Sequence, residues 1–216
     1  IATSDKNGTA YVYKAKKPRL ELSGAHWHSR FMPSTQLSSL KDPFKSKAIA
    51  FDKAMKAAGI QVIYTNAYRP PQRQYLMYYS AMIARGQIDP KDVPPFQPEN
   101  DDDPVNISWI HYNSTNIDNA ASKSGGTSLF NKYGIGNNPI GKPYKSNHNG
   151  GEAFDCRISN WGIGKTITNA SGQRITIKSR ADIAKVGESY GVKHWSQYGE
   201  KATGKKDDPH WSKSGR

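Results

Sequence analysis

The most informative stretch of this 216-residue chain runs from residue 146 to residue 158 and reads SNHNGGEAFDCRI. His148 stands in its polar first half, and the pair Gly150-Gly151 tolerates the backbone angles of a tight turn. The alternating residues 152–158 predict a strand that carries Asp155. Since the turn lets His148 and Asp155 approach one another, this stretch predicts a turn and a strand that supply two ligands to one metal ion.

A second polar group stands near the end of the chain, where residues 207–211 read DDPHW. A catalytic zinc ion typically has three protein ligands and one open position, and His210 would supply the third ligand. Asp207 is a carboxylate able to take a proton from the attacking water. Asp208 is a rival for this role, and only the spacing to His210 favours Asp207.

The first of these segments resembles the zinc D-alanyl-D-alanine carboxypeptidases and L-alanyl-D-glutamate peptidases of the VanY-like family. Residues 146–155 match the SxHxxGxAxD signature of that family, and Asp207 and His210 resemble its (E/D)xxH motif. The corner Ala67-Tyr68-Arg69, with Gln74 on the following helix, is similar to its YR…Q segment. The matching motifs lie within residues 60–212 and leave the N-terminal part uncovered.

The resemblance implies one zinc ion bound by His148, Asp155 and His210, with Asp207 as the general base. It also implies that Arg69 binds a peptide carboxylate or stabilises the developing oxyanion, for which a guanidinium group is well suited. The further substrate-binding residues that we expect are Tyr68, Gln74, Ser146 and Trp211. The implied fold is that of the hedgehog and D-Ala-D-Ala peptidases.

The order of the predicted elements indicates an α+β fold, with helices packed against a mainly antiparallel sheet that carries a mononuclear zinc site. Hydrophobic periodicity predicts helices and strands along most of the chain after residue 44. The predicted helices are 45–58, 72–85, 120–133 and 180–190, and the predicted strands are 60–67, 152–158, a hairpin at 167–177, 192–195 and 210–211. Residues 87–108 and the apparent insertion 193–206 are predicted as extended loops.

We expect residues 1–44 to form an arm of loops and short strands packed on a catalytic domain of residues 45–216. The chain begins with Ile1 and shows no signal peptide, so a processed form or part of a longer protein is expected. No run approaches the roughly 18 apolar residues of a membrane span, so no span is expected.

The chain has 31 Lys and Arg residues against 18 Asp and Glu residues, a formal net charge of +13. This charge favours polyanionic partners, such as an anionic bacterial envelope or a nucleic acid. The basic residues are scattered, as on a solvated surface, and no basic-aromatic nucleic-acid module is present. We therefore expect no nucleic-acid partner.

The remaining cysteine and histidines offer alternatives to the zinc site. The only cysteine, Cys156, excludes an intramolecular disulfide and a multi-cysteine zinc site, and strand alternation turns it away from Asp155. His26 and His28 could bind a metal from a strand but have no carboxylate near them in sequence. His111 and His194 are expected to be structural, although His194 could line the cleft. A metal nuclease would need a histidine on the helix 180–190, which has none.

These features predict a zinc metallopeptidase that hydrolyses peptidoglycan stem or cross-link peptides in the periplasm or cell wall. A phage lysin or a secreted antibacterial domain, the latter with an immunity protein as partner, would fit this activity. The alternative is a catalytically inactive module that binds cell wall or nucleic acid and keeps a structural zinc. The identity of the bond that is cut, whether a terminal D-alanine, a D,D cross-link or an L-alanyl-D-glutamate link, stays open.

Overall fold

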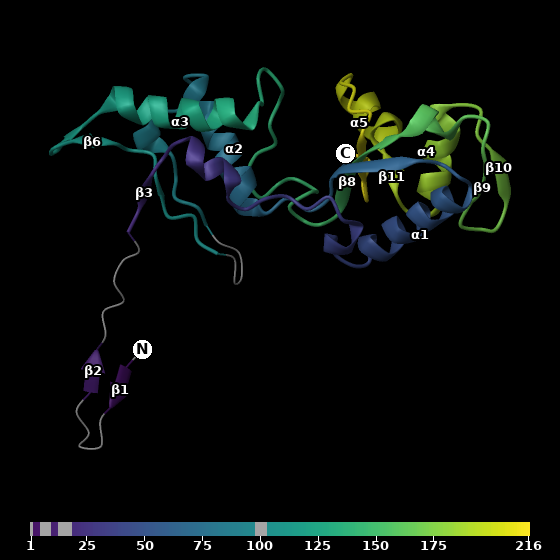
Figure 1. Cartoon of the computed structure of the whole chain (residues 1–216), viewed down its shortest axis with the longest axis horizontal. Coiled ribbons are helices and arrows are strands. Elements are labelled where there is room, and N and C mark those ends of the chain that lie inside the picture. The colour runs from purple at the N-terminus through teal and green to yellow at the C-terminus, as the bar shows by residue number, and fades with distance from the viewer. Residues whose placement is uncertain (1, 5–9, 13–18, 98–102) are drawn as a thin grey trace.

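A four-stranded antiparallel sheet stands at the centre of the part of the molecule that holds the predicted motifs (Figure 1). Its strand order is β11 (Lys193–His194), β12 (His210–Ser212), β8 (Ala153–Ile158) and β4 (Val62–Asn66). The computed structural model describes residues 2–4, 10–12, 19–97 and 103–216. The predicted strands 210–211 and 60–67 are therefore the two neighbours of the strand that carries Asp155, and β11 pairs with β12 at the edge.

The strand register places polar residues of three strands side by side. His210 on β12 and Asn66 on β4 are both paired with Asp155 on β8. A bulge between Tyr64 and Asn66 shifts the register, because continuous pairing from Tyr64 would have placed Thr65 opposite Asp155. Such bulges re-aim side chains, and this one brings an amide instead of a hydroxyl next to Asp155.

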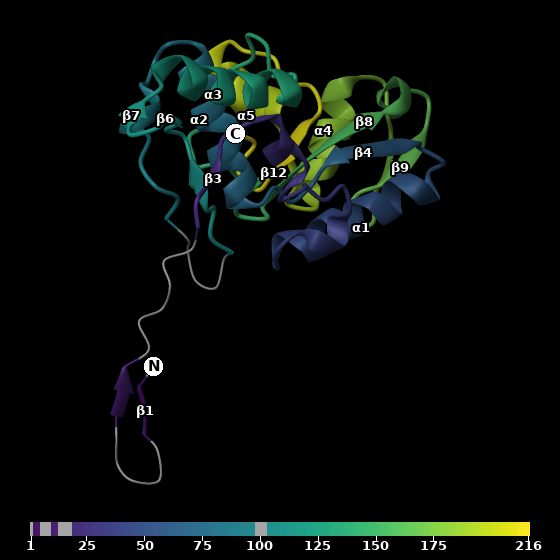
Figure 2. The ribbon, with the colours of Figure 1, turned by 60° about the vertical axis from the view of Figure 1, so that its left-hand side comes forward.

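One face of the sheet is covered by helices α1 (Phe44–Ala57) and α4 (Arg180–Ser189) and by the hairpin of β9 (Thr166–Thr168) and β10 (Arg174–Thr176) (Figure 2). Phe154 and Trp211 of the sheet pack in this core with Phe51 of α1. Each large apolar side chain buried in this way contributes roughly 1.5–3 kcal/mol to stability. Asp155 and His210 alternate with these core residues, so they lie on the other face.

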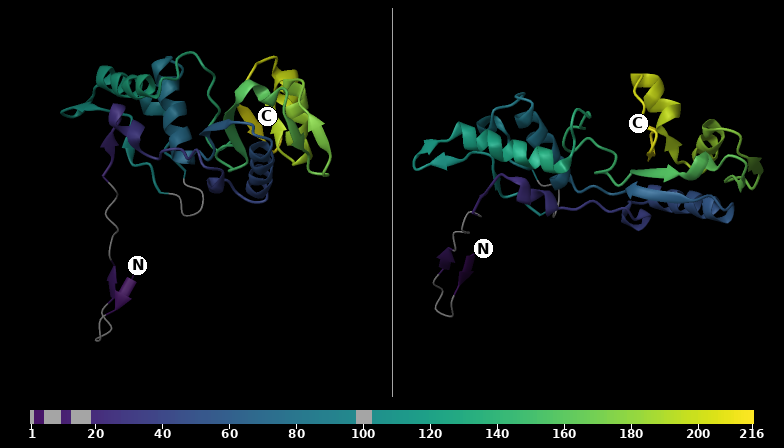
Figure 3. Two further views of the ribbon diagram at one scale, coloured as in Figure 1. Left: turned by 45° about the vertical axis from the view of Figure 1, so that its right-hand side comes forward. Right: turned by 45° about the horizontal axis from the view of Figure 1, so that its top comes forward.

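A second core lies beside the sheet, as Figures 1 and 3 show from different sides. It contains helices α2 (Pro71–Ala84) and α3 (Asn119–Tyr133), the short helix η1 (Ala25–Ser29) and the parallel pair β3 (Glu21–Leu22) and β5 (Ile107–Ser108). Close contact between α2 and α3 depends on Gly126, where a Cβ atom would meet Ile83 at 2.8 Å. The corner that carries Arg69 connects β4 of the sheet to α2 of the second core.

The remaining elements are short. They are the antiparallel pairs β1 (Ala2–Ser4) with β2 (Ala10–Val12) and β6 (Tyr112–Asn113) with β7 (Asn116–Ile117), the helix α5 (Trp195–Thr203), and the turns η2 (Leu37–Ser39), η3 (Pro90–Asp92) and η4 (Ser159–Gly162). Within the described ranges, no helix combines the length and the apolar character needed to cross a membrane.

The α+β class and the predicted helices and strands are confirmed, with ends that differ by one or two residues in most cases. The loop predicted at 87–108 contains η3 and β5. In the predicted arm, Trp27 is buried in the second core and Leu37 and Leu40 in the first, whereas residues 1, 5–9 and 13–18 lie outside the described residues. The division of the chain at residue 44 stays a prediction.

The prediction of an extended loop at 193–206 is wrong, because α5 occupies most of this segment. The His194 side chain accepts a hydrogen bond from the Ser196 N–H, and the Gln197 side chain accepts one from the His194 N–H, which together make a capping box. Gly204 ends the helix in the left-handed conformation, with φ of 69°. Histidine is an unusual N-cap, so the start of this helix lacked its usual sequence signal.

Candidate metal centre

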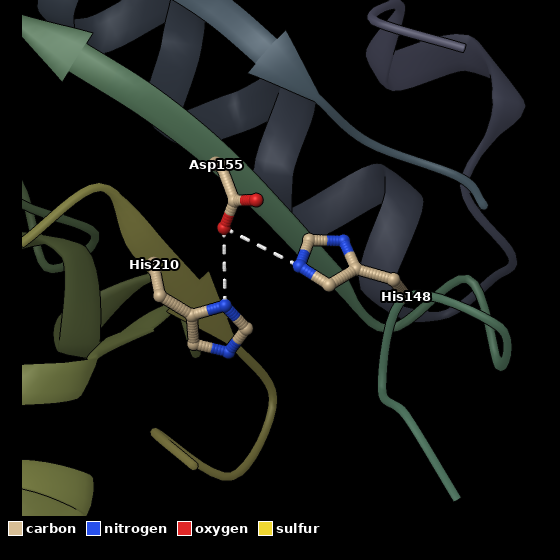
Figure 4. A group of neighbouring side chains, drawn as sticks. All are labelled: His148, Asp155 and His210. Atoms are coloured by element: carbon tan, nitrogen blue, oxygen red, sulfur yellow. Dashed lines mark hydrogen bonds and ion pairs between the residues drawn. The ribbon is translucent and has the colours of Figure 1, made fainter. Parts of the chain in front are cut away.

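The side chains of His148, Asp155 and His210 converge on one point (Figure 4). One ligand atom from each lies within 4.8 Å of the others. The Oδ1 atom of Asp155 is 3.3 Å from Nε2 of His148 and 3.1 Å from Nδ1 of His210. Among the described residues, this is the only group of three or more such side chains with the spacing of a metal site.

The hydrogen bonds of His148 determine which of its nitrogens is protonated. Its Nδ1 atom lies 2.9 Å from the main-chain oxygen of Ala67. Because a carbonyl oxygen can only accept, Nδ1 must carry the proton and donate it. In the neutral ring, the lone pair of Nε2 then points at Asp155, which is the arrangement of a histidine metal ligand held by a carbonyl group.

In His210 the two ring nitrogens exchange roles, and a nitrogen lone pair again faces Asp155. Its Nε2 atom lies 3.3 Å from the main-chain oxygen of Arg216, so Nε2 donates and the lone pair of Nδ1 faces Asp155. Two ring lone pairs and a carboxylate oxygen thus meet in one place. Such a group is repulsive unless a cation, either a proton or a metal ion, lies between the atoms. The donor set of two imidazoles and one carboxylate fits zinc.

Asp155 is the central acceptor of the cluster. Burial raises the pKa of its carboxyl group, but when the His148 and His210 rings each carry a second proton, their hydrogen bonds and positive charge outweigh burial and hold the pKa far below its usual range. Asn66 adds a hydrogen bond from Nδ2 to Oδ2 of Asp155, at 3.2 Å. A positive charge next to Asp155 thus favours its ionised form, which is the form that binds a metal ion.

Asp207 and Asp208, which the sequence leaves as rivals, lie in different surroundings. Asp207 lines the same pocket as the three clustered side chains. Although it is exposed at the pocket, nearby atoms displace water from its carboxyl group and raise its pKa. Asp208 lies outside this pocket and forms an ion pair with Arg180 of α4. Of the two carboxylates, only Asp207 is placed to exchange protons with a molecule in the pocket.

Arg69 also lines the pocket and is held from two sides. Its main-chain N–H donates to the oxygen of His148 at 3.2 Å, and its Nη1 atom donates to Oε1 of Gln74 at 2.9 Å. Gln74 is fully buried, and its amide nitrogen donates to the main-chain oxygen of Gly141. The expectation that Gln74 binds substrate is therefore corrected, because its side chain is buried and its amide oxygen and nitrogen bond to Arg69 and Gly141.

The other predicted substrate-binding residues differ in position. Ser146 lines the pocket, and its Oγ atom accepts a hydrogen bond from the His148 N–H at 3.3 Å. Tyr68 is half-buried and is not among the residues that line the pocket. Trp211 has no exposed surface and packs between Phe154 and Phe51. The prediction for Trp211 is wrong, because strand alternation turns it into the core when His210 faces the cluster.

Trp195 is a pocket residue that the sequence did not reveal. Its ring stands edge-on to His210, with ring centres 5.7 Å apart, and its indole N–H donates to the main-chain oxygen of Lys205 at 2.7 Å. It lies in the first turn of α5, the helix that was predicted as a loop. Helical periodicity over residues 195–203 would have been the signal for it.

The pocket has a volume of about 670 Å³, which is large enough for a short peptide. Its lining comes from four parts of the chain: the corner at Arg69, the loop 139–148, Asp155 on β8 and the segment 195–216. The carboxylate of Asp155 contacts both histidines through its Oδ1 atom. The arrangement offers a candidate metal site, a carboxylate and a guanidinium group to one bound molecule.

The alternative sites have structural roles. Cys156 is buried in the first core, and burial raises the pKa of its thiol. His194 caps α5 and bonds to the main-chain oxygen of Asp208, at 2.7 Å, without lining the pocket. His111 lies 3.0 Å from the hydroxyl of Ser23, and the His28 ring contacts the ring of Tyr133 at a tilted angle. His26 pairs with the carboxylate of Glu21, which corrects the expectation that this histidine has no carboxylate near it.

No protein-family model and no curated protein sequence matches the chain. Among solved structures, the chain is similar to a variant of the vancomycin-resistance D,D-pentapeptidase VanY from a VanB-type resistance cassette, crystallised in complex with Zn(II). The two share 14% sequence identity, the match covers 85% of this chain and 80% of the other, and the TM-score is 0.36. Any assignment of function therefore depends on the residues of the site.

Proposed function

We propose that this chain is a zinc metallopeptidase that hydrolyses the stem or cross-link peptides of peptidoglycan. The observation that carries the proposal is the meeting of three lone pairs, from His148, Asp155 and His210, in a pocket that also holds Asp207 and Arg69. The resemblance of residues 146–155, 207–210 and the Arg69 corner to one peptidase family supports the choice of substrate.

The proposed ligands are His148 through Nε2, Asp155 through Oδ1 and His210 through Nδ1. When bound, zinc lowers the pKa of water to about 7 and polarises a carbonyl group. The main-chain oxygens of Ala67 and Arg216 keep both imidazole rings in the tautomer that this role needs.

Asp207 is the proposed general base. Its carboxylate takes the proton of the attacking water and delivers it to the nitrogen of the departing amine, so that the carboxylate is regenerated in each cycle. The raised pKa of Asp207 suits this role, because a more basic carboxylate holds the proton better between the two transfers.

Arg69 has two proposed roles, and the same position of its guanidinium group would serve either of them. Its guanidinium group either binds a carboxylate of the peptide or donates to the carbonyl oxygen as negative charge develops there. Gln74 is a positioning residue that holds Nη1 of Arg69 at 2.9 Å. Because Gln74 also bonds to Gly141, the position of Arg69 is linked to the loop 139–147.

The test is incubation of the purified protein with defined muropeptides, with and without a zinc chelator, followed by mass spectrometry of the products. We expect zinc-dependent cleavage that is lost in His148→Ala and kept in His26→Ala, the matched control, whose histidine lies outside the pocket. The masses identify the bond. Tight zinc binding without cleavage of any muropeptide would overturn the peptidase and favour a non-catalytic binding module.

A phage lysin or an exported antibacterial domain, with an immunity protein in the second case, remains the proposed biological setting. The net charge of +13 supports action on an anionic wall or envelope.

A further inference from the structure

The pocket contains more positive charge than the proposed reaction uses. Besides Arg69, it is lined by Lys145 and Arg216. No described residue forms an ion pair with the Lys145 side chain, whereas the nearby Lys213 is paired with Glu152 at 2.7 Å. Lys145 is thus an exposed ammonium group free to meet a charge on the bound molecule.

The charge balance of the pocket favours a ligand with more than one negative charge. Arg69 and Lys145 carry two positive charges, and Asp155 and Asp207 carry two negative charges, so these four side chains cancel. A zinc ion would then leave two positive charges in excess, before Arg216 is counted. A pocket of one sign attracts ligands of the opposite sign, and two carboxylates would balance it.

The main chain at Arg69 and the main chain at Lys145 both lie next to His148, a proposed metal ligand. The Arg69 N–H donates to the main-chain oxygen of His148 at 3.2 Å. Lys145 precedes His148 by three residues. The turn that contains His148 is closed by a hydrogen bond of 3.0 Å from the Asn149 N–H to the main-chain oxygen of Ser146. The two cations therefore approach the cluster from different segments, and one peptide bound at the cluster can meet both.

We infer that the substrate is a peptide with two carboxylates near the scissile bond, one bound by Arg69 and the other by Lys145. This inference rests on the proposed function and makes Lys145 a specificity-determining residue. In stem peptides, such a second carboxylate is present on a γ-linked D-glutamate or on a diaminopimelate residue, and amidation removes it. The enzyme therefore prefers stem peptides whose internal carboxylates are free.

The experiment compares two stem pentapeptides that contain D-glutamate and diaminopimelate, one with both internal carboxylates free and one with both amidated. The wild-type protein should cleave the free peptide with a kcat/KM at least about tenfold higher, mostly through KM, as expected when one or both charge-assisted contacts are kept. Lys145→Met should lower kcat/KM for the free peptide about tenfold and leave the amidated peptide unchanged, and Lys145→Arg should restore the preference.

Lys142→Met is the matched control, because Lys142 is exposed on the same loop but does not line the pocket. It should keep the wild-type preference. Zinc content and thermal unfolding, measured for each variant, separate loss of contact from loss of fold. Singly amidated peptides then identify which carboxylate meets Lys145. The preference should also shrink as ionic strength rises, because the ammonium group is exposed.

Equal kcat/KM values for the two peptides, or a preference that is undiminished in Lys145→Met, would overturn the inference and leave the peptidase intact. If the zinc-loaded protein cleaves neither peptide, the proposed function fails instead. Calorimetric titration of both peptides into the zinc-loaded Asp207→Asn variant then still tests whether Lys145 binds a carboxylate of the peptide. Tighter binding of the free peptide that is weakened in the additional presence of Lys145→Met supports the inference, and binding that this substitution leaves unchanged overturns it.

Discussion

At the scale of single residues, the site is defined by which ring nitrogen of His148 and of His210 carries a proton. His148 and His210 each donate one ring N–H to a main-chain oxygen, so that both free lone pairs face Asp155. The difference between Asp207 and Asp208 is also local: one carboxylate lines the pocket, and the other is paired with Arg180. Both features make predictions that one substitution can test.

Replacing Asp207 with Asn should lower kcat about 10²- to 10⁴-fold, the usual contribution of a general base, because the amide cannot accept the proton. Zinc content should stay at the wild-type value, since Asp207 is not a proposed ligand. Asp208→Asn is the matched control and should change kcat by less than about threefold, since an exposed ion pair contributes little. Steady-state kinetics and metal analysis measure both. A larger loss in Asp208→Asn would reverse the assignment.

Replacing Asn66 with Ala should weaken zinc binding about tenfold or more, because the amide that orients Oδ2 of Asp155 is lost. Competition with a chromophoric chelator measures the affinity. Thr65→Ala is the neighbouring control, since the Thr65 hydroxyl lies on the exposed side and contacts only the main-chain oxygen of Asp155, at 3.3 Å. An unchanged zinc affinity in Asn66→Ala would remove Asn66 from the support of the site.

At the scale of elements, α5 is the part of the fold that completes the pocket. It carries Trp195, and it is bound to α4 through the 2.9 Å hydrogen bond from Gln197 to Glu188 and the ion pair of Arg180 with Glu200. The chain returns from α5 to β12 directly after Gly204, over the residues that contain Asp207. The end of this helix therefore influences both the pocket and the base.

Gly204→Ala tests this role. With φ of 69°, residue 204 is left-handed, which costs a residue with a Cβ atom roughly 1–2 kcal/mol, although no neighbouring atom would obstruct the methyl group. We expect the free energy of unfolding in urea to fall by about 1 kcal/mol and kcat/KM to fall with it. A fall in stability alone would show that the end of α5 does not influence Asp207.

At the scale of the whole molecule, the site lies where the sheet meets the helices of the second core. His148 belongs to the loop that follows α3, Asp155 to β8, and His210 to β12 near the end of the chain. Arg69 belongs to the connection between β4 and α2. A metal ion at this point would join segments that are far apart in sequence, so its binding should stabilise the entire fold.

Zinc should therefore raise the midpoint of thermal unfolding, and chelation should lower it. At a free zinc concentration of about 1,000 times the dissociation constant, the gain is about 4 kcal/mol in the free energy of unfolding, provided the unfolded chain does not bind zinc. Calorimetry of the zinc-loaded and chelated protein measures it. His148→Ala should lose most of this gain, and a full zinc-dependent shift in that variant would place the metal elsewhere.

The sequence by itself determined what depends on neighbouring residues. The Gly150-Gly151 turn before the strand of Asp155 and the helix predicted at 45–58 follow from local backbone preferences and from the periodicity of apolar residues. The identity of the donor groups also follows from composition, since a chain with one cysteine must build a metal site from histidine and carboxylate. Whether those groups bind zinc stays a prediction.

Only the tertiary structure decided the features that depend on contacts between distant segments. Asp208 is excluded from the pocket by Arg180, which lies 28 residues earlier, and the tautomer of His148 depends on Ala67, which lies 81 residues earlier. Trp211 is in the core because its strand pairs with β8 in the register that turns His210 outward. Hydrogen bonds and burial act between positions in space, so no local pattern contains them.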